Sequence, residues 1–372
     1  MSEKEASASE YALETKVAGE FTAPDLPYLP PVPKRAHRIG LIGCGGISQS
    51  HLDAYRRAGF EVVALADRVL EKAISRRDAF FPEALATDDA DALIARDDIE
   101  VLDITPHPFD RVPIVRAALM AGKHVLSQKP FVTDLDEGEG LCDLADSRNL
   151  KLAVNQNGRW APHLAYMREA ARAGIIGEVI SSHVSIHWDH SWTRGTPFEE
   201  IEHLVLYDFG IHWFDFVSSL IGDRARRVTA SRAFASGQSM KIPMMAQVLI
   251  EFEGGQASLI FDAHARYGPM DTTYITGTRG SISSQGPNLG EQSVKLWTAK
   301  GVAQPQLLGA WFNDGFQGSM GELLVSIEQN RAPLNDARDN LRSLELCFAA
   351  IQSSVDGTSK RPGETRRLEM ST

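Results

Sequence analysis

The chain has 372 residues, of which 43% are hydrophobic and 23% charged, and its formal net charge is -11. This length is enough for two globular domains with separate cores. The negative charge disfavours nucleic acid and anionic membranes as partners, because both would repel the protein over the Debye length. Cofactor phosphates would therefore be held by backbone N–H groups rather than by a basic surface.

Cysteine usage and targeting signals indicate the compartment. The three cysteines, Cys44, Cys142 and Cys347, are odd in number and far apart. This spacing does not predict a disulfide framework or a thiolate metal site, and it fits a reducing environment. We find no signal peptide and no apolar run long enough to span a bilayer. We therefore expect a cytoplasmic protein.

Residues 1–36 are predicted to form an N-terminal arm that begins rich in Ser, Glu and Ala and ends rich in Pro. Proline fixes φ and removes a hydrogen-bond donor, so the arm should be extended or partly disordered. Tyr28 and Leu29 are the residues that would attach it to the body of the protein. We expect no catalytic role for the arm.

Residues 37–157 alternate between short apolar runs and helical segments. This rhythm predicts a parallel sheet covered on both faces, as in a Rossmann dinucleotide-binding domain. The predicted strands are 39–42, 62–66, 101–104, 124–126 and 151–154, and the predicted helices lie near 69–80, 88–96 and 111–121.

Residues 158–372 read as a second, α+β domain with a large, open, mostly antiparallel sheet. A helix is predicted over 162–173, and residues 179–188 alternate with period two, which is typical of a half-buried strand. Further strands are predicted near 226–236, 243–253, 256–264, 272–276 and 292–298, with a hairpin turn at 253–256. Helices near 318–330 and 336–356 close the chain, and we expect the C-terminal helix to pack back on the first domain.

A glycine-rich turn follows the first predicted strand. Gly43 permits a tight turn, Gly45 permits close approach of a pyrophosphate, and the helix that follows offers free N–H groups. Asp67 ends the next strand, where a carboxylate would bind the adenosine ribose and favour NAD, although Arg68 offers a partner for the phosphate of NADP. The predicted cofactor-binding residues here are Gly43, Gly45, Gly46, Ile47, Ser48, Asp67 and Arg68.

Three further residues suggest proton transfer. Lys129 directly follows a predicted strand, at the sheet edge where ligands bind in open α/β folds. Asp208 and His212 are spaced i, i+4, which in a helix places carboxylate and imidazole within hydrogen-bonding reach, as for an oriented general base. A solvated lysine and a structural Asp/His pair are the alternatives.

Histidines and tryptophans cluster after the predicted strand 179–188. His183, His187 and His190 carry no HExxH or cysteine pattern, so we predict no metal. Trp188, His190 and Trp192 are instead predicted to border a polar substrate pocket, with an indole stacked on a sugar ring. Arg159 and Trp160 are predicted pocket residues too, with a domain-interface role as the alternative.

Taken in chain order, these motifs resemble the Gfo/Idh/MocA oxidoreductases, the family of glucose–fructose oxidoreductase and inositol dehydrogenase. The resemblance covers roughly residues 37–360. It rests on residues 39–48, 66–68, 103–106, 121–130 and 207–212, and on Ile327, Pro333, Asn340 and Leu341 near the C-terminus.

The resemblance implies a Rossmann domain followed by an open-sheet domain that mediates homodimers or homotetramers. It implies that Lys129 bonds the reacting hydroxyl and contacts the nicotinamide, with Thr105 and Gln128 also at the cofactor. Asp208 and His212 would bind substrate and accept the proton. The implied substrates are sugars, polyols and related glycosides.

Two positions depart from the family pattern. The usual Glu-Lys-Pro is Gln128-Lys129-Pro130 here, which removes a negative charge beside the lysine. The histidine that follows Thr-Pro in the family is replaced around Asp110 and Arg111, which weakens the case for cofactor contacts from that loop.

The sequence therefore predicts an NAD(P)-dependent oxidoreductase that transfers a hydride between a nicotinamide and a hydroxyl carbon of a sugar, cyclic polyol or glycoside. Lys129, Asp208 and His212 are the predicted catalytic residues. Two alternatives remain: a lyase or glycosidase that works by transient ring oxidation with bound NAD, and a sensor that binds dinucleotide or sugar without turnover.

Overall fold

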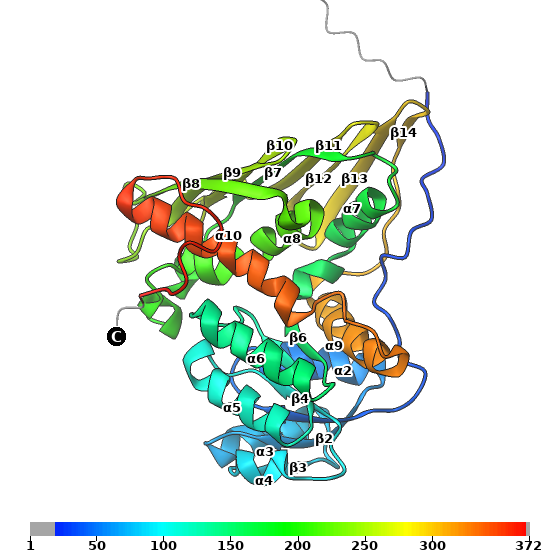
Figure 1. Cartoon of the computed structure of the whole chain (residues 1–372), viewed down its shortest axis with the longest axis vertical. Coiled ribbons are helices and arrows are strands. Elements are labelled where there is room, and N and C mark those ends of the chain that lie inside the picture. The colour runs from blue at the N-terminus through cyan, green and yellow to red at the C-terminus, as the bar shows by residue number, and fades with distance from the viewer. Residues whose placement is uncertain (1–18, 370–372) are drawn as a thin grey trace, which may run out of the picture.

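The computed structural model describes residues 19–369 and contains two sheets (Figure 1). The first has six strands, all parallel, in the order β3-β2-β1-β4-β5-β6. Its strands are β1 (Arg38–Ile42), β2 (Glu61–Ala66), β3 (Leu85–Thr87), β4 (Val101–Ile104), β5 (His124–Gln128) and β6 (Leu152–Asn155). The predicted Rossmann domain is confirmed.

The helices of this domain are α2 (Ser48–Ala58), α3 (Leu70–Phe80), α4 (Ala90–Ile94), α5 (Pro108–Met120) and α6 (Leu135–Ser147). Strand β3 and helix α6 were not predicted. The N-cap of α6 is Asp134, whose side chain accepts hydrogen bonds from the N–H groups of Asp136 and Glu137. Gly138 lets helix α10 (Ala337–Asp356) pack closely on α6, because a Cβ at Gly138 would lie 2.6 Å from Leu341 of α10.

The second sheet has eight strands in the order β14-β13-β12-β11-β7-β10-β9-β8. Every neighbouring pair is antiparallel except β7 and β10, so the predicted mostly antiparallel sheet is confirmed. Its strands are β7 (Val179–His187), β8 (Ala225–Ala233), β9 (Met245–Phe252), β10 (Gly255–Asp262), β11 (Met270–Gly277), β12 (Gly280–Asn288), β13 (Glu291–Thr298) and β14 (Gly301–Ala303).

Among residues 19–369, helices cover only one face of this sheet and leave the other face bare (Figure 1). The covering helices are α7 (Pro162–Arg172), α8 (Ile211–Ile221) and α10 (Ala337–Asp356). The predicted hairpin is present, since Gly255 of β10 pairs with Phe252 of β9. Strands β12 and β14 were not predicted, because β12 is rich in Ser and Gly and β14 is only three residues long.

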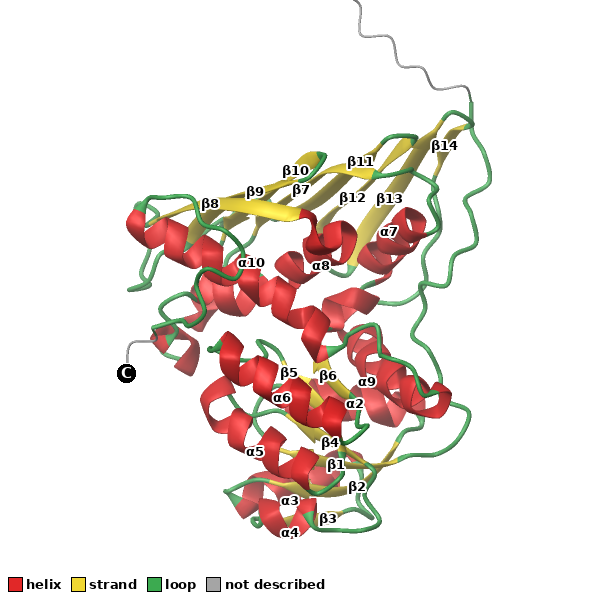
Figure 2. Cartoon of the chain, viewed as in Figure 1, coloured by secondary structure: helices red, strands yellow, loops and turns green. Residues whose placement is uncertain are grey.

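Helix α9 (Trp311–Gln329) returns the chain to the first domain (Figure 2). Its residues Phe316, Met320 and Leu323 share a buried cluster with Leu52 and Tyr55 of α2. This packing closes one face of the Rossmann sheet with a segment from the far end of the sequence.

The described part of the arm follows the outside of both sheets (Figure 1). Glu20 forms a bridge with Val302 of β14, and Tyr28 packs edge-on against Tyr166 with ring centroids 5.9 Å apart. Tyr28 therefore fixes the arm to the body, whereas Leu29 is exposed. Residues 1–18 of the predicted arm lie outside the described residues. Between residues 19 and 369, none of the helices is both long and apolar enough to cross a membrane.

Candidate active site

The glycine turn after β1 is shaped for a diphosphate. Gly43 has φ 97°, and a Cβ there would lie 2.6 Å from Thr105 Oγ1, so only glycine fits. Gly45 and Gly46 face open space. Within residues 19–369, the backbone N–H groups of Gly45, Gly46, Ile47 and Ser48 make no hydrogen bond. Free donors at a helix N-terminus with room beside them fit a dinucleotide pyrophosphate.

The adenosine end of the turn carries charges of both signs. Asp67 Oδ2 accepts the Cys44 N–H at 2.7 Å, which holds the carboxylate against the glycine turn, while Arg68 is exposed. Arg76 of α3, which was not predicted as a site residue, places its guanidinium 3.2 Å from Ser48 Oγ and 3.3 Å from the Gly45 carbonyl oxygen. This cation adds to the backbone donors at the predicted phosphate position. This contact of Arg76 depends on how α3 packs against α2, so no sequence pattern predicts it.

Lys129 and Asp208 meet although they are far apart in the sequence. Lys129 follows β5, and its Nζ lies 3.2 Å from Asp208 Oδ2 and 2.8 Å from the Asp208 carbonyl oxygen. The two side chains are mostly buried, with exposed fractions of 14% and 13%. Lys129 is therefore not a solvated surface lysine.

Asp208 lies in the π-helical segment η4 (Leu204–Phe209), immediately before α8. The expected α-helical spacing between Asp208 and His212 does not hold, because the Gly210 N–H bonds the Val205 carbonyl five residues back. Across the described residues, no hydrogen bond joins Asp208 to His212. The prediction that Asp208 orients His212 by such a bond is wrong, since its carboxylate pairs with Lys129 instead.

His212 is partly exposed, but its Nδ1 is buried and has no partner among the described residues. The ring packs edge-on against Trp311, with centroids 5.5 Å apart, and lies close to Gly158. Burial, and secondarily the nearby charge of Lys129, lower the pKa of His212 well below its usual value. The imidazole is therefore neutral at physiological pH and able to accept a proton.

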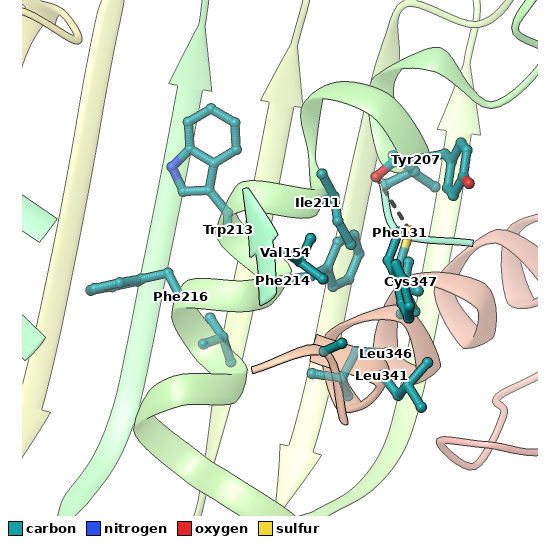
Figure 3. Close-up of a cluster of buried hydrophobic side chains, with 14 of the residues drawn as sticks. Phe131, Val154, Tyr207, Ile211, Trp213, Phe214, Phe216, Leu341, Leu346 and Cys347 are labelled. Atoms are coloured by element: carbon teal, nitrogen blue, oxygen red, sulfur yellow. Dashed lines mark hydrogen bonds between the residues drawn. The ribbon is translucent and has the colours of Figure 1, made fainter. Parts of the chain in front are cut away.

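The helix that carries His212 is fixed by an apolar cluster (Figure 3). Ile211 and Phe214 of α8 are fully buried among Val154 of β6 and Leu341 and Leu346 of α10. The Cys347 thiol contacts the Leu206 carbonyl of η4 at 3.4 Å. The Asp/His segment is thus held by both domains.

A cavity of about 370 Å³ lies between the glycine turn and the Lys129–Asp208 pair. Its lining includes Ile47, Thr105, Gln128, Lys129 and Asp208, whereas His212 is not among its lining residues. Phe109 and Phe198 add apolar walls. Five predicted site residues from four separate segments therefore line one cavity.

Arg111 holds the loop beneath this cavity. Its fully buried guanidinium donates to the carbonyl oxygens of Pro106, Pro130 and Phe131, and burial lowers its pKa to about 10. Arg111, in the region where the family's histidine is replaced, thus fixes the backbone that follows Lys129.

Trp188, His190 and Trp192, which were predicted to border the substrate pocket, lie beside η4 and are not among the residues that line this cavity. Trp188 stacks on His190 with centroids 5.5 Å apart, and His190 packs 4.3 Å from Phe209. Burial lowers the pKa of His190 to about 4. Trp192 is largely exposed and contacts Phe198, which reaches the cavity.

Arg159 and Trp160 lie in packing contacts, which corrects their predicted place in the pocket. Arg159 is 9% exposed and forms a two-pronged ion pair with Asp215, at 2.7 and 2.8 Å. Trp160 is 3% exposed and lies against α9, where a Cβ on Gly318 would overlap its ring. Both side chains join the end of the Rossmann domain to later segments.

These features define an oxidoreductase of two domains, one of them a Rossmann domain that binds NAD. An oxidoreductase family model described as an NAD-binding Rossmann fold matches residues 37–156, and the GFO/IDH/MocA C-terminal domain matches residues 164–283. The chain belongs to the Gfo/Idh/MocA family, and the predicted NAD dependence is confirmed with it.

Named relatives match over most of the chain. D-apiose dehydrogenase from Paraburkholderia graminis is 27% identical over 343 residues, which are 88% of this chain and 90% of the relative. Inositol 2-dehydrogenase from Rhizobium meliloti is 26% identical over 329 residues, covering 86% of this chain and 97% of the relative.

Solved structures share the fold. An oxidoreductase from Agrobacterium radiobacter, solved with NAD+, L-tartaric acid and magnesium, has a TM-score of 0.80 and 22% identity, covering 88% of this chain and 99% of that one. Levoglucosan dehydrogenase in complex with NADH and levoglucosan has a TM-score of 0.77 and 20% identity, covering 89% of this chain and all of that one.

Proposed function

We propose that the protein is an NAD-dependent dehydrogenase that oxidises a secondary hydroxyl or hemiacetal carbon of a neutral sugar, cyclic polyol or glycoside. The observation that carries the proposal is the pairing of Lys129 with Asp208 in the cavity that also reaches Ile47 of the glycine turn. The relatives named as apiose and inositol dehydrogenases support the substrate class.

The chain's residues have distinct roles in this reaction. Lys129 would donate a hydrogen bond from Nζ to the reacting oxygen, and Asp208 would accept one from a neighbouring hydroxyl. His212, kept neutral by burial, would accept the hydroxyl proton, a contribution worth about 10²–10⁴ in rate. Bound NAD supplies the hydride acceptor.

The charges around the cavity favour a neutral substrate. Asp208 and Glu200 both line it, and the Lys129 ammonium is already paired with the first of these. The Arg111 guanidinium also lines the cavity and donates only to backbone carbonyl oxygens, so two cations balance the two carboxylates and the lining has no excess charge to attract an ionic substrate. Apolar rings such as Phe198 offer a surface for the C–H face of a sugar.

The test is a panel of aldoses, inositols, anhydrosugars and glycosides, run with NAD and with NADP and monitored for reduced cofactor. We expect one class of neutral polyol to reduce NAD. Lys129→Met should lower kcat about 10²–10⁴-fold, whereas Lys300→Met, at an exposed turn, should not. Consumption of sugar with no net reduced cofactor would replace the proposal with an elimination reaction.

We further propose that the protein is a cytoplasmic homodimer or homotetramer. The bare face of the eight-stranded sheet exposes Leu249, Met270 and Tyr274, which supports pairing through this face. The three cysteines are unpaired and buried, which agrees with a reducing compartment. Light scattering should give a multiple of the mass of one chain, and Leu249→Arg with Tyr274→Arg should lower it.

A further inference from the structure

A chain of buried polar side chains lies behind the cavity. It comprises Tyr55 and His51 of α2, Asp103 of β4, Asn155 of β6 and Gln128 of β5. The side chains of His51 and Asp103 are 0% exposed, and Gln128 is 5% exposed. Polar groups at this depth adopt the arrangement that pairs donors with acceptors.

The backbone fixes the orientation of the Gln128 amide. The Lys129 N–H lies 2.9 Å from Gln128 Oε1, and an N–H group can only donate. A flipped amide would place an NH₂ group against this donor. Asn155 Nδ2 lies 2.9 Å from the same Oε1. Gln128 Oε1 therefore accepts two hydrogen bonds and has no capacity for a ligand.

The rest of the chain supports the same orientation. Because Asn155 donates to Gln128, its Nδ2 also faces His51 Nε2 at 3.1 Å, and that nitrogen must accept. His51 Nδ1 then donates to Asp103 Oδ2 at 2.7 Å, and the same oxygen accepts the Tyr55 hydroxyl at 2.7 Å. One tautomer of His51 satisfies every contact. The network therefore holds Asn155 as a donor toward Gln128.

Gln128 Nε2 is the one donor group of this amide that is still available to bind a ligand. It has no partner within residues 19–369, yet it is not sealed from solvent, and Gln128 lines the cavity beside Ile47 and Thr105. We propose that Gln128 donates a hydrogen bond from Nε2 to the carboxamide oxygen of the nicotinamide, an inference that rests on the proposed function. A glutamate in this position would present an acceptor instead.

The proposal predicts which cofactor analogues bind well. The 3-acetylpyridine analogue of NAD keeps the carbonyl oxygen but lacks the NH₂ group. A glutamine donor needs only the oxygen, so wild type should bind NAD and the analogue within about twofold. In Gln128→Glu, the carboxylate oxygen that replaces Nε2 can only accept a hydrogen bond. NAD can donate one from its carboxamide NH₂ group after this group rotates, whereas the analogue has no NH₂ group to donate. We expect this variant to prefer NAD about tenfold.

Calorimetric dissociation constants for NAD, the analogue and ADP-ribose, measured on wild type and Gln128→Glu, test this. Glutamate retains an oxygen for Lys129 N–H and Asn155 Nδ2, so the variant should fold, which its unfolding midpoint would verify. ADP-ribose should bind both proteins equally. An unchanged NAD-to-analogue ratio in a folded variant that binds ADP-ribose would overturn the Gln128 proposal alone. Wild type that bound neither NAD nor ADP-ribose would remove the proposed function as well.

Discussion

His212 illustrates how a residue becomes a base through its surroundings. Its buried Nδ1 has no carboxylate to stabilise a proton, and burial and the Lys129 charge both disfavour the imidazolium. The sequence spacing suggested an Asp–His pair with the opposite effect, because a carboxylate at hydrogen-bonding distance would raise the pKa of the ring. The structure instead gives the carboxylate to Lys129.

We expect His212→Ala to lower kcat about 10²–10⁴-fold while the dissociation constant for NAD hardly changes. Because the pKa of His212 lies well below 6.5, the ring stays neutral as the pH falls, so the acid limb of kcat/KM should lie below pH 6.5. Steady-state kinetics over a pH series measure both effects.

The control for this variant is His183→Ala, because His183 is exposed on β7 and hydrogen-bonds Ser258. Its activity should equal that of wild type. A His212→Ala enzyme with wild-type turnover would show that another group accepts the proton.

At the residue scale, sequence patterns located single functional positions better than their partners. The position of Lys129 after β5 and the glycine turn at Gly43 are local features of the chain. The contacts of Arg76 with the turn and of His51 with Asp103 depend on how helices pack, and their sequence separations of 31 and 52 residues carry no pattern. Arg159 was predicted to lie in the pocket, but its guanidinium pairs with Asp215 instead.

At the scale of elements, the apolar strands of the Rossmann sheet were predictable because each is buried on both faces. Strand β12 was not, since its Ser and Gly residues carry little hydrophobic signal, and pairing with β11 and β13 determines its conformation. The π-helical segment η4 was also not predictable. The residues of η4 are equally suited to an α-helix, and the segment forms its wider turn where it packs against α10.

Gly210 is the residue that this wider turn requires. A Cβ there would lie 2.8 Å from the carbonyl oxygens of both Val205 and Leu206, and backbone oxygens cannot move without remodelling η4. We expect Gly210→Ala to destabilise the protein by about 1–3 kcal/mol and to reduce kcat by displacing Asp208. Urea unfolding and steady-state kinetics provide the two measurements.

The matched control is Gly140→Ala in α6, where a Cβ meets no atom within 4 Å. There alanine should be neutral or stabilising by up to about 1 kcal/mol, because it lowers the entropy of the unfolded chain and favours helix. Equal effects of the two substitutions would mean that the close contact at Gly210 is relieved at no cost.

At the scale of the whole molecule, the two domains share a core, and that core contains neutral histidines. His163 in α7 is 2% exposed, packs 6.1 Å from the ring of Trp311, and has a buried Nε2 without a partner in the described part of the chain. Burial lowers the pKa of His163 to about 3. Asp271 acts in the opposite direction, because burial raises its pKa to about 7.

The shift at His163 makes stability depend on pH with a definite sign. The unfolded chain protonates His163 near pH 6.5 while the folded protein does so only near pH 3, so the unfolded state binds more protons between these values. The contribution of His163 is therefore fully favourable above about pH 6.5 and is lost as the pH falls toward 3. At pH 5 the loss amounts to about 2 kcal/mol.

His163→Leu removes this titration without adding charge, so the comparison with wild type isolates it from Asp271 and the other titrating groups. Between pH 7.5 and pH 5, the variant should lose about 2 kcal/mol less stability than wild type, measured from urea midpoints and slopes at each pH. The difference at pH 7.5 should be small, because leucine fills a similar volume and leaves no unpaired nitrogen. Parallel pH dependence in the two proteins would show that the buried imidazole is solvated or paired in solution, and that its burial does not make the folded state less stable in acid.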